Sequence, residues 1–177
     1  MIANIFDTET TGLIDNPARR IDIQPECISI AIIKVNLLNG NIIDEYYNVF
    51  KPSKRISEEI TRITGFTNEM LVNKPSIEAH LDEIINRLID CKLIIGQNIS
   101  FDMGIVEFEC KRYNRNIKWP SKINIVQHAI FLKGYRLKLN DLHMELFGSN
   151  FENAHNALED AKATAKIATE MYRKGLL

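Results

Sequence analysis

The stretch Ile2–Leu13, with the sequence IANIFDTETTGL, decides how the rest of the chain is arranged. Its first part, residues 2–7, is a short apolar run that ends at threonine and glycine, which is typical of a buried β-strand. Side chains two positions apart on a strand point to the same face, so Asp7 and Glu9 converge on one point if the strand extends that far. The stretch therefore predicts a buried strand whose end presents two acids to a crevice.

Apolar patterning predicts the remaining elements. Residues 26–36 and 42–50 are rich in Ile, Val and Tyr and flank Asn39-Gly40, which predicts an antiparallel hairpin. Residues 93–96 and 123–126 are further strand candidates. Helices are expected after the cap residues Ser57, Thr67 and Ser76, after residue 98, and over residues 127–132, 139–147 and 157–174. This order predicts an α/β fold with a mixed five-stranded sheet, an antiparallel hairpin plus parallel strands, flanked by helices.

Composition and length narrow the class of protein. The chain has 177 residues, 45% hydrophobic and 25% charged, which is typical of one globular domain over residues 1–177. Its three cysteines, Cys27, Cys91 and Cys110, form no CxxC pair, which argues against a disulfide framework and a zinc site. The start lacks a signal peptide, and no run reaches the length of a membrane span. We expect a cytoplasmic protein with reduced thiols and no membrane association.

The formal charge of −1 is low for a nucleic-acid enzyme, but the basic residues are unevenly distributed. Residues 111–138 contain no acid and eight basic residues: Lys111, Arg112, Arg115, Lys118, Lys122, Lys133, Arg136 and Lys138. Two interpretations stay open for this segment, a surface that contacts phosphates and a set of ordinary solvated faces. The aromatic residues within it, Tyr113, Trp119 and Tyr135, fit either base stacking or the rim of the core.

Three further residues extend the acidic pair. Asp102 falls in the first turn of a helix, where a capping role explains it equally well. Asp160 shares a helix face with Thr164, Ile167, Ala168 and Met171, and an unpaired carboxylate on that inward face is costly, so a metal partner is expected. His155 lies just before this helix. Carboxylates are hard ligands for Mg²⁺ or Mn²⁺, which activate water against phosphodiesters, and a histidine can accept the proton of that water.

The three motifs together resemble the DEDDh family of 3′-to-5′ exonucleases. They are Asp-x-Glu-Thr-Thr-Gly-Leu at 7–13, Asn-x-x-Phe-Asp at 98–102 and His-x₄-Asp at 155–160, in this order. The resemblance implies a ribonuclease H-like fold and two divalent cations, Mg or Mn, held by Asp7, Glu9, Asp102 and Asp160. It also implies that His155 is the general base. The residues implied to contact the substrate are Thr10, Thr11, Gly12, Leu13, Ile63, Thr64, Phe66, Asn98 and Phe101.

The chain departs from the family pattern in three places. Gln97 stands where many relatives have His, and Asn124-Ile125 replaces a common Asp-Thr, which affects how penultimate nucleotides are bound. The sequence ends at Leu177, so no segment that tethers the domain to a DNA polymerase is expected, although association with a polymerase stays possible.

The resemblance favours the 3′ end of single-stranded DNA as substrate, since the run Asp7–Leu13 is closer to the DNA-proofreading branch than to oligoribonuclease. Exonucleolytic trimming of RNA 3′ ends is the enzymatic alternative. A phosphatase of the haloacid dehalogenase type is excluded, because the second acid of its DxDxT motif is Glu9 here and its magnesium motif is missing. A non-catalytic nucleic-acid-binding module is the alternative from another class, and the presence of all five catalytic residues argues against it.

Overall fold

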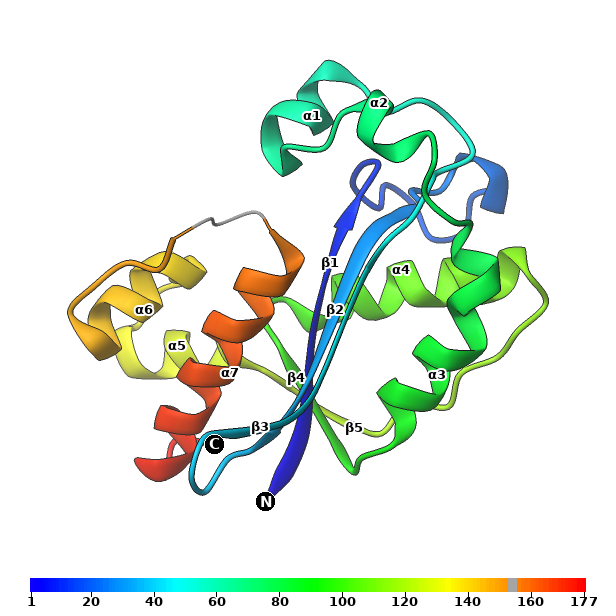
Figure 1. Cartoon of the computed structure of the whole chain (residues 1–177). Helices are drawn as coiled ribbons and strands as arrows, with labels where there is room; N and C mark the ends of the chain where they lie inside the picture. Colours follow the sequence, from blue (N-terminus) through cyan, green and yellow to red (C-terminus); the bar gives the residue numbers. More distant parts are fainter. Residues whose placement is uncertain (153–155) are drawn as a thin grey trace.

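A sheet of five strands in the order β3-β2-β1-β4-β5 runs through the middle of the molecule (Figure 1). The computed structural model describes residues 1–152 and 156–177, and for His128 and residues 131–133 it describes the backbone alone. β1 pairs antiparallel with β2 and parallel with β4, so the predicted mixed sheet is confirmed. The strands are β1 (Ile2–Thr10), β2 (Cys27–Asn36), β3 (Asn41–Val49), β4 (Leu93–Gly96) and β5 (Ser121–Asn124).

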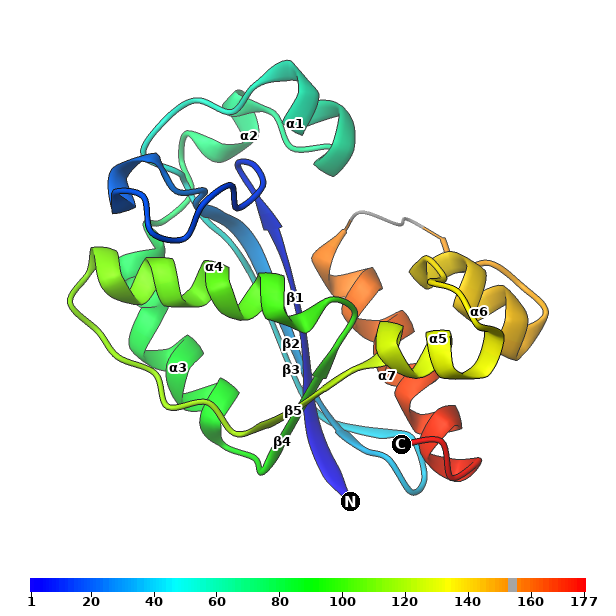
Figure 2. The same cartoon turned by 180° about the vertical axis from the view of Figure 1, so that it is seen from behind.

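Helices cover both faces of the sheet, as the opposite views of Figures 1 and 2 show. The α-helices are α1 (Glu58–Thr64), α2 (Asn68–Leu71), α3 (Leu81–Ile89), α4 (Ile99–Arg112), α5 (Ile125–Lys133), α6 (Leu139–Phe147) and α7 (Ala157–Arg173). Two 3₁₀ turns, η1 (Ile21–Ile23) and η2 (Ile77–His80), lie in the connections. None of the helices in residues 1–152 and 156–177 combines the length and apolar character that a membrane span requires.

The alternation of side chains along β1 divides the core into two layers. Ala3 and Ile5 are fully buried on the side of α5, α6 and α7, whereas Phe6 is buried on the side of α3 and α4. β1 is longer than predicted from the sequence, because Thr8 and Glu9 continue the pairing with Ile30 and Ser29 of β2. The condition for Asp7 and Glu9 to share a face is therefore met.

The predicted strand at residues 123–126 is wrong in its bounds. β5 ends at Asn124, and Ile125 already begins α5. The side-chain oxygen of Asn124 accepts a hydrogen bond from the Val126 amide at 3.1 Å, which is the geometry of a helix N-cap. Ser76 caps the η2 turn, which precedes α3, so the single helix expected after Ser76 is divided.

The hairpin and the small helices follow the predicted turn and cap residues. Gly40 adopts φ +78° in the loop between β2 and β3, and its amide donates to the Asn36 carbonyl at 2.7 Å. Ser57 and Thr67 cap α1 and α2 through their side chains. These two helices lie over the C-terminal end of β1 (Figure 1). A separate apolar cluster holds them there: Ile28, Val49, Ile56, Phe66 and Leu71.

The core position of β2 generates a stability prediction. Ile33 on β2 is fully buried, whereas Ile42 on β3 is 50% exposed. We expect Ile33→Ala to lower the free energy of unfolding by about 2–5 kcal/mol, because it removes buried methyl groups and leaves a cavity. The matched variant Ile42→Ala is expected to change it by no more than about 0.5 kcal/mol. Urea unfolding followed by circular dichroism measures both, and similar losses in the two variants would contradict the assigned core.

Candidate active site

Two carboxylates leave the C-terminal end of β1 on the α7 side of the sheet. Asp7 and Glu9 share the face of Ile5, which packs in the cluster beneath α5, α6 and α7. The register of β1 against β2 shifts between Glu9 and Thr10. A bulge of this kind bends the strand and changes the direction of the side chains beside it, and bulges recur next to active sites.

The first turn of α7 brings a third carboxylate to the same point. Asp160 precedes the buried residues Ala161, Thr164 and Ala168, whose small side chains let the helix approach β1 and β2 closely. Asp7, Glu9 and Asp160 each offer one carboxylate oxygen, and these three atoms all lie within 4.8 Å of one another. The structure thus brings together three of the four acids that the sequence predicts as metal ligands.

The fourth acid reaches the end of β1 from the opposite face. Asp102 is 3% exposed in the first turn of α4. Its Oδ1 accepts two hydrogen bonds from Thr8, one from the amide at 3.0 Å and one from the hydroxyl at 2.7 Å. Thr8 lies between Asp7 and Glu9 in sequence and points to the other face, so it holds Asp102 beside the group of three. This role of Thr8 had no signal in the sequence.

Burial and mutual repulsion raise the pKa of three of these acids, Asp7, Glu9 and Asp102. Burial raises the pKa of Glu9 to about 8, and the charges of Asp160 and Asp102 add to the effect. Burial likewise raises the pKa of Asp102 to about 7, although the hydrogen bonds from Thr8 oppose the shift. The pKa of Asp7 is raised by burial and then by Asp102, Asp160 and Glu9. The ionised forms of these three acids are thus disfavoured by burial and by one another's charge.

The donor set fits a divalent cation. Three carboxylate oxygens from two secondary-structure elements can occupy one side of a hard cation, and such a cation would replace the protons that the raised pKa values retain. Site residues at the carboxyl end of parallel strands are typical of open α/β sheets. The arrangement is therefore chemically suited to bind a cation and polarise a phosphate ester.

The last residue of β1 and the turn that follows it, residues Thr10–Leu13, lie directly after Glu9 in the chain and form a surface that we call the platform. The Thr10 hydroxyl donates to the Gly12 carbonyl at 2.7 Å, which closes the turn, and the Leu13 side chain is 83% exposed. A cavity of about 210 Å³ adjoins the platform and is lined on its other side by Lys54 and Arg55. The platform thus presents an apolar side chain and backbone groups beside a concave surface.

The other predicted substrate residues lie on α1 and α4. Ile63 is 46% exposed, and Gly65 at φ +75° ends α1 after it. The Thr64 hydroxyl donates to the Ile60 carbonyl, and Phe66 is buried in the cluster beneath α1 and α2.

Asn98, the N-cap of α4, is exposed and has φ +59°. Its backbone N–H donates to Asn124 Oδ1 at 3.0 Å. Asn124 therefore joins the start of α4 to the start of α5, a link that the sequence did not indicate. Phe101 packs against the cluster on the α3 and α4 side. His155, the predicted general base, lies outside the described residues.

Two arginines and the tryptophan of the basic segment 111–138 make contacts with other parts of the protein. The Arg112 guanidinium donates to backbone carbonyls, and Arg115 pairs with Asp82 at 2.7 Å. Trp119 stacks on Phe6 at 5.8 Å and donates to Glu107, so it belongs to the core rim. For these residues the structure favours internal contacts over contacts with phosphate.

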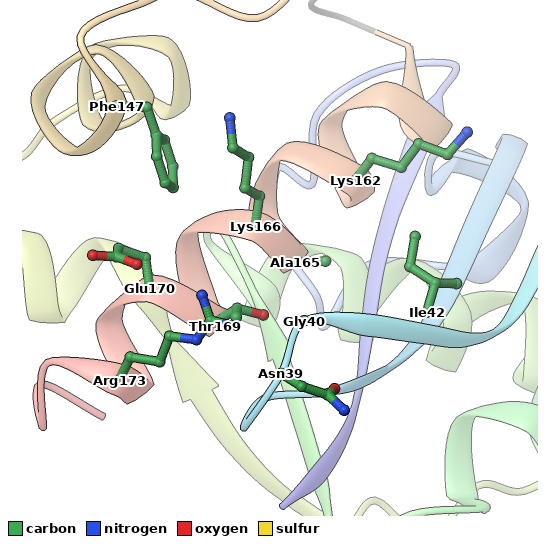
Figure 3. A pocket seen from close by; sticks show the side chains of 10 residues that line it. All are labelled: Asn39, Gly40, Ile42, Phe147, Lys162, Ala165, Lys166, Thr169, Glu170 and Arg173. Atoms are coloured by element: carbon green, nitrogen blue, oxygen red, sulfur yellow. The ribbon is translucent and has the colours of Figure 1, made fainter.

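A second hollow of about 260 Å³ lies between α7 and the β2–β3 loop (Figure 3). The cations along it contact protein groups: Lys162 pairs with Glu45 at 3.4 Å, and the Lys166 ammonium lies 3.2 Å from His143 Nε2 and 4.1 Å from the centre of the Phe147 ring. In Figure 3 the charged ends of Lys162 and Lys166 point apart. We therefore assign no ligand to this hollow.

Comparison with known proteins gives a consistent result. The sequence model of the RNase_T exonuclease family matches residues 5–168. A curated relative, the PolC-type DNA polymerase III of Thermotoga maritima, is 34% identical over 177 residues. The alignment covers 96% of this chain and 12% of the relative, so the chain spans about an eighth of that protein's length.

Solved structures share the fold. The nuclease domain of 3′hExo, described as a DEDDh family member bound to rAMP, superposes with a TM-score of 0.77 at 18% identity and covers 98% of this chain and 92% of that one. The zinc-bound form of the E. coli ExoI–ssDNA complex superposes with a TM-score of 0.79 at 21% identity and covers 98% of this chain and 41% of that one. The ribonuclease H-like exonuclease fold expected from the sequence is thus confirmed.

The raised pKa values predict how stability depends on pH. Glu9 keeps its proton in the folded chain up to about pH 8, whereas its ordinary pKa is 4.5. Between these values the folded chain binds more protons than the unfolded chain, so the free energy of unfolding of the metal-free protein should fall as pH rises. The expected slope is up to about 1.4 kcal/mol per pH unit for each such proton.

Urea unfolding of chelator-treated protein at several pH values between 4.5 and 8 measures this slope. Glu9→Gln removes the titrating group and should flatten it, and a saturating divalent cation should do the same because it replaces the protons. A metal-free protein that becomes more stable across this window would contradict the assigned electrostatics.

Proposed function

Because the chain belongs to the RNase_T exonuclease family, we propose that it removes nucleoside monophosphates from the 3′ end of single-stranded DNA by metal-dependent phosphodiester hydrolysis. The observation that carries this proposal is the group of Asp7, Glu9 and Asp160, whose carboxylate oxygens lie within 4.8 Å of one another at the end of β1. Asp102, anchored by Thr8 beside them, completes the set of four acids.

Asp7, Glu9, Asp102 and Asp160 would hold two Mg²⁺ or Mn²⁺ ions, which when bound neutralise phosphate oxygens and lower the pKa of an attacking water. His155 takes the proton of that water as its oxygen attacks the terminal phosphorus. The bond from phosphorus to the O3′ of the preceding nucleotide breaks, and a proton from solvent completes the new 3′-hydroxyl. One nucleoside 5′-monophosphate leaves in each cycle.

The platform and its neighbours select a strand end. Thr10, Thr11, Gly12 and Leu13 pack on the terminal nucleotide, and the exposed Leu13 offers an apolar contact to a base or sugar. In this proposal Ile63 and Thr64 at the end of α1, with Phe66 after it, and Asn98 and Phe101 at the start of α4 are the further residues that border the strand end. A paired duplex end is broader than a single strand, so unpairing adds a free-energy cost before hydrolysis.

The preference for DNA is supported by the PolC-type relatives, which are named as DNA polymerases. Since the chain spans 12% of such a relative, a proofreading role together with a polymerase is part of the proposal. Recognition of RNA depends on the 2′-hydroxyl. Trimming of RNA 3′ ends by the same site is the alternative that a side-by-side assay decides.

Digestion of a single-stranded oligonucleotide labelled at its 5′ end tests direction, metal dependence and sugar preference together. We expect a descending ladder with Mg²⁺ or Mn²⁺, no cleavage in excess EDTA, and slower digestion of the matched RNA and of a blunt duplex. Early release of the labelled 5′ nucleotide, cuts in circular single strands, or full activity after exhaustive chelation would each contradict the proposal. Faster digestion of RNA than of DNA would support the RNA-trimming alternative instead of the DNA substrate.

Variants at His155 and Asp7 separate proton transfer from metal binding. We expect His155→Ala to slow cleavage by roughly 10²- to 10⁴-fold, because general-base assistance is lost, while the affinity for Mn²⁺ in isothermal titration stays close to the native value. Asp7→Ala should lose both activity and Mn²⁺ affinity. His80→Ala, a change in the η2 turn on the α3 side of the sheet, is the matched histidine control and should cleave at the native rate. Native activity in His155→Ala would show that another group accepts the proton.

A further inference from the structure

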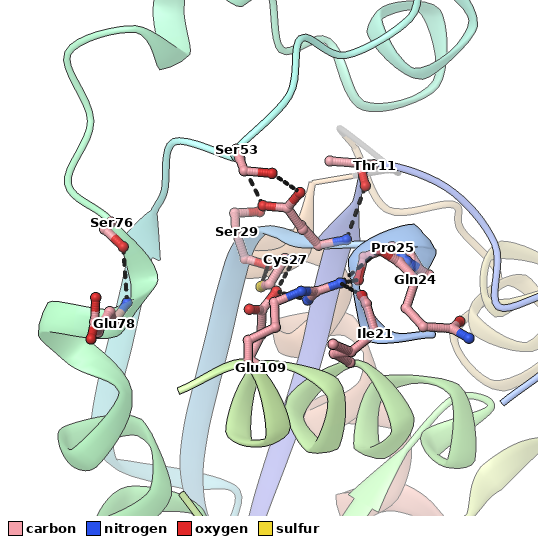
Figure 4. Close-up of polar contacts among 12 residues, drawn as sticks. Thr11, Ile21, Gln24, Pro25, Cys27, Ser29, Ser53, Ser76, Glu78 and Glu109 are labelled. Carbon is pink, nitrogen blue, oxygen red and sulfur yellow. Dashed lines mark hydrogen bonds and ion pairs between the residues drawn. The ribbon is translucent and has the colours of Figure 1, made fainter. Parts of the chain in front are cut away.

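Two charged residues in the last turns of α4, Arg112 and Glu109, contact the segment that joins β1 to β2 and the first residue of β2, and Glu109 is labelled in Figure 4. Arg112 Nη2 donates to the carbonyls of Gln24 at 2.6 Å and Pro25 at 2.9 Å, and it lies 3.3 Å from the Ile21 carbonyl. The Arg112 side chain is only 13% exposed. One guanidinium thus contacts the carbonyl of the first residue of η1 and those of the two residues that follow the turn.

Glu109, one turn earlier on α4, holds the next residue of the same segment. It is 1% exposed, and its Oε1 accepts the Cys27 amide at 2.8 Å. The same oxygen lies 2.9 Å from Arg112 Nη1. Each buried charge therefore has an opposite charge and at least one backbone partner, which offsets the cost of burying the pair, although Arg112 Nη1 makes no hydrogen bond to the described residues.

Glu26 lies between Pro25 and Cys27, the two residues that α4 holds, and it is hydrogen-bonded to the platform. Its backbone amide donates to the Thr11 hydroxyl at 2.9 Å, and its carbonyl accepts the Thr11 amide at 2.9 Å. Its carboxylate accepts the Ser53 amide at 2.7 Å and the Ser53 hydroxyl at 2.6 Å. The three consecutive residues Pro25, Glu26 and Cys27 thus connect α4, the platform and the chain that leads to α1.

The same helix carries Asp102 in its first turn. Asp102 and Glu109 are seven residues apart, which is about 10 Å along an α-helix. An α-helix of this length is stiff, so it fixes the distance between the acid that faces the proposed metals and the segment that carries the platform. The long connection between β1 and β2 does not have to maintain this distance by itself.

We infer that Glu109 and Arg112 are positioning residues for the terminal nucleotide: they fix the platform Thr10–Leu13 relative to Asp102 through Pro25, Glu26 and Cys27. This inference rests on the proposed function, because it concerns the binding of the same substrate. The hydrogen bonds and the ion pair of Glu109 and Arg112 join them to the η1 segment, to Cys27 and to each other, so both act through the platform. Loosening the platform weakens a contact that is present in both the bound substrate and the transition state, so KM rises while kcat stays nearly constant.

The double variant Glu109→Gln/Arg112→Met tests the inference. It removes both charges together, so no unpaired charge stays buried, and the glutamine oxygen still accepts the Cys27 amide. With the 5′-labelled oligonucleotide we expect KM to rise about tenfold and kcat to change by less than about twofold. Mn²⁺ affinity should stay unchanged, because Asp7, Glu9, Asp102 and Asp160 are intact. Amide hydrogen exchange at Thr11–Leu13 should become faster in the absence of substrate.

A matched control removes the other ion pair at the end of α4. Asp82→Asn/Arg115→Met eliminates the pair between α3 and the segment after α4, whose side chains are 67% and 43% exposed. It leaves the platform contacts intact, so KM and amide exchange should equal those of the native protein. Arg112→Lys is a milder second variant for the case in which the double variant does not fold. It keeps the charge opposite Glu109 but loses the guanidinium fork, and KM should rise several-fold.

The readouts distinguish positioning from simple stabilisation of the fold. A double variant, or Arg112→Lys, that melts at lower temperature but keeps native KM and native exchange at Thr11–Leu13 would overturn the inference. The exchange rates are measured without substrate. A native protein without nuclease activity would therefore count against the proposed function, and unchanged exchange in the variants would count against the positioning role.

Discussion

The burial of several carboxylates at one end of β1 is the interaction on which the rest of the structure depends. Burial and mutual repulsion raise the pKa of Asp7, Glu9 and Asp102, so the fold holds these groups together against a force that separates them. The pairing of β1 with β2 and the packing of α7 on the sheet resist this repulsion. β1 stays paired with β2 through Thr10, and α7 packs on the sheet through buried small residues that precede and follow Thr164. A local conflict of this kind, compensated by the surrounding scaffold, is typical of functional sites.

The two faces of the sheet contribute to the site in different ways. Asp7 and Glu9 point to the α7 face, where Asp160 joins them, whereas Thr8 points to the α4 face and anchors Asp102. A strand separates its alternate side chains onto opposite faces, and they can act on one substrate only where the strand ends and the sheet no longer divides them. The extension of β1 to Thr10 and the bulge after Glu9 place that end beside the platform.

Short stretches of sequence predicted the strand β1 and the hairpin of β2 and β3, because both depend on neighbouring residues. The apolar run at residues 2–7 predicted β1, the spacing of Asp7 and Glu9 predicted a shared face if the strand extended to Glu9, and Asn39-Gly40 located the hairpin. The strand expected at residues 123–126 was placed with the wrong bounds, because a short apolar run fits a strand and a buried helix equally well, and the cap formed by Asn124 ends β5 and starts α5. Contacts between distant residues had no local signal: Thr8 and Asp102 are 94 positions apart, and Cys27 and Glu109 are 82 apart.

The distribution of charged residues in the sequence likewise did not predict which cations are free to contact a phosphate. Arg112 belongs to the basic segment of the sequence, yet it is buried against backbone carbonyls and Glu109, and Arg115 pairs with Asp82, so the count of cations alone does not give the number of residues free to contact phosphate. The chain has a formal charge of −1 and gathers carboxylates where the proposed substrate must place its phosphate. Where these acids are ionised and no divalent cation is bound, the site therefore repels a nucleic acid, and the raised pKa of Glu9 puts its ionisation near pH 8. Under the proposed function, cations raise the affinity for the strand, and by thermodynamic linkage the strand raises the affinity for the cations by the same factor.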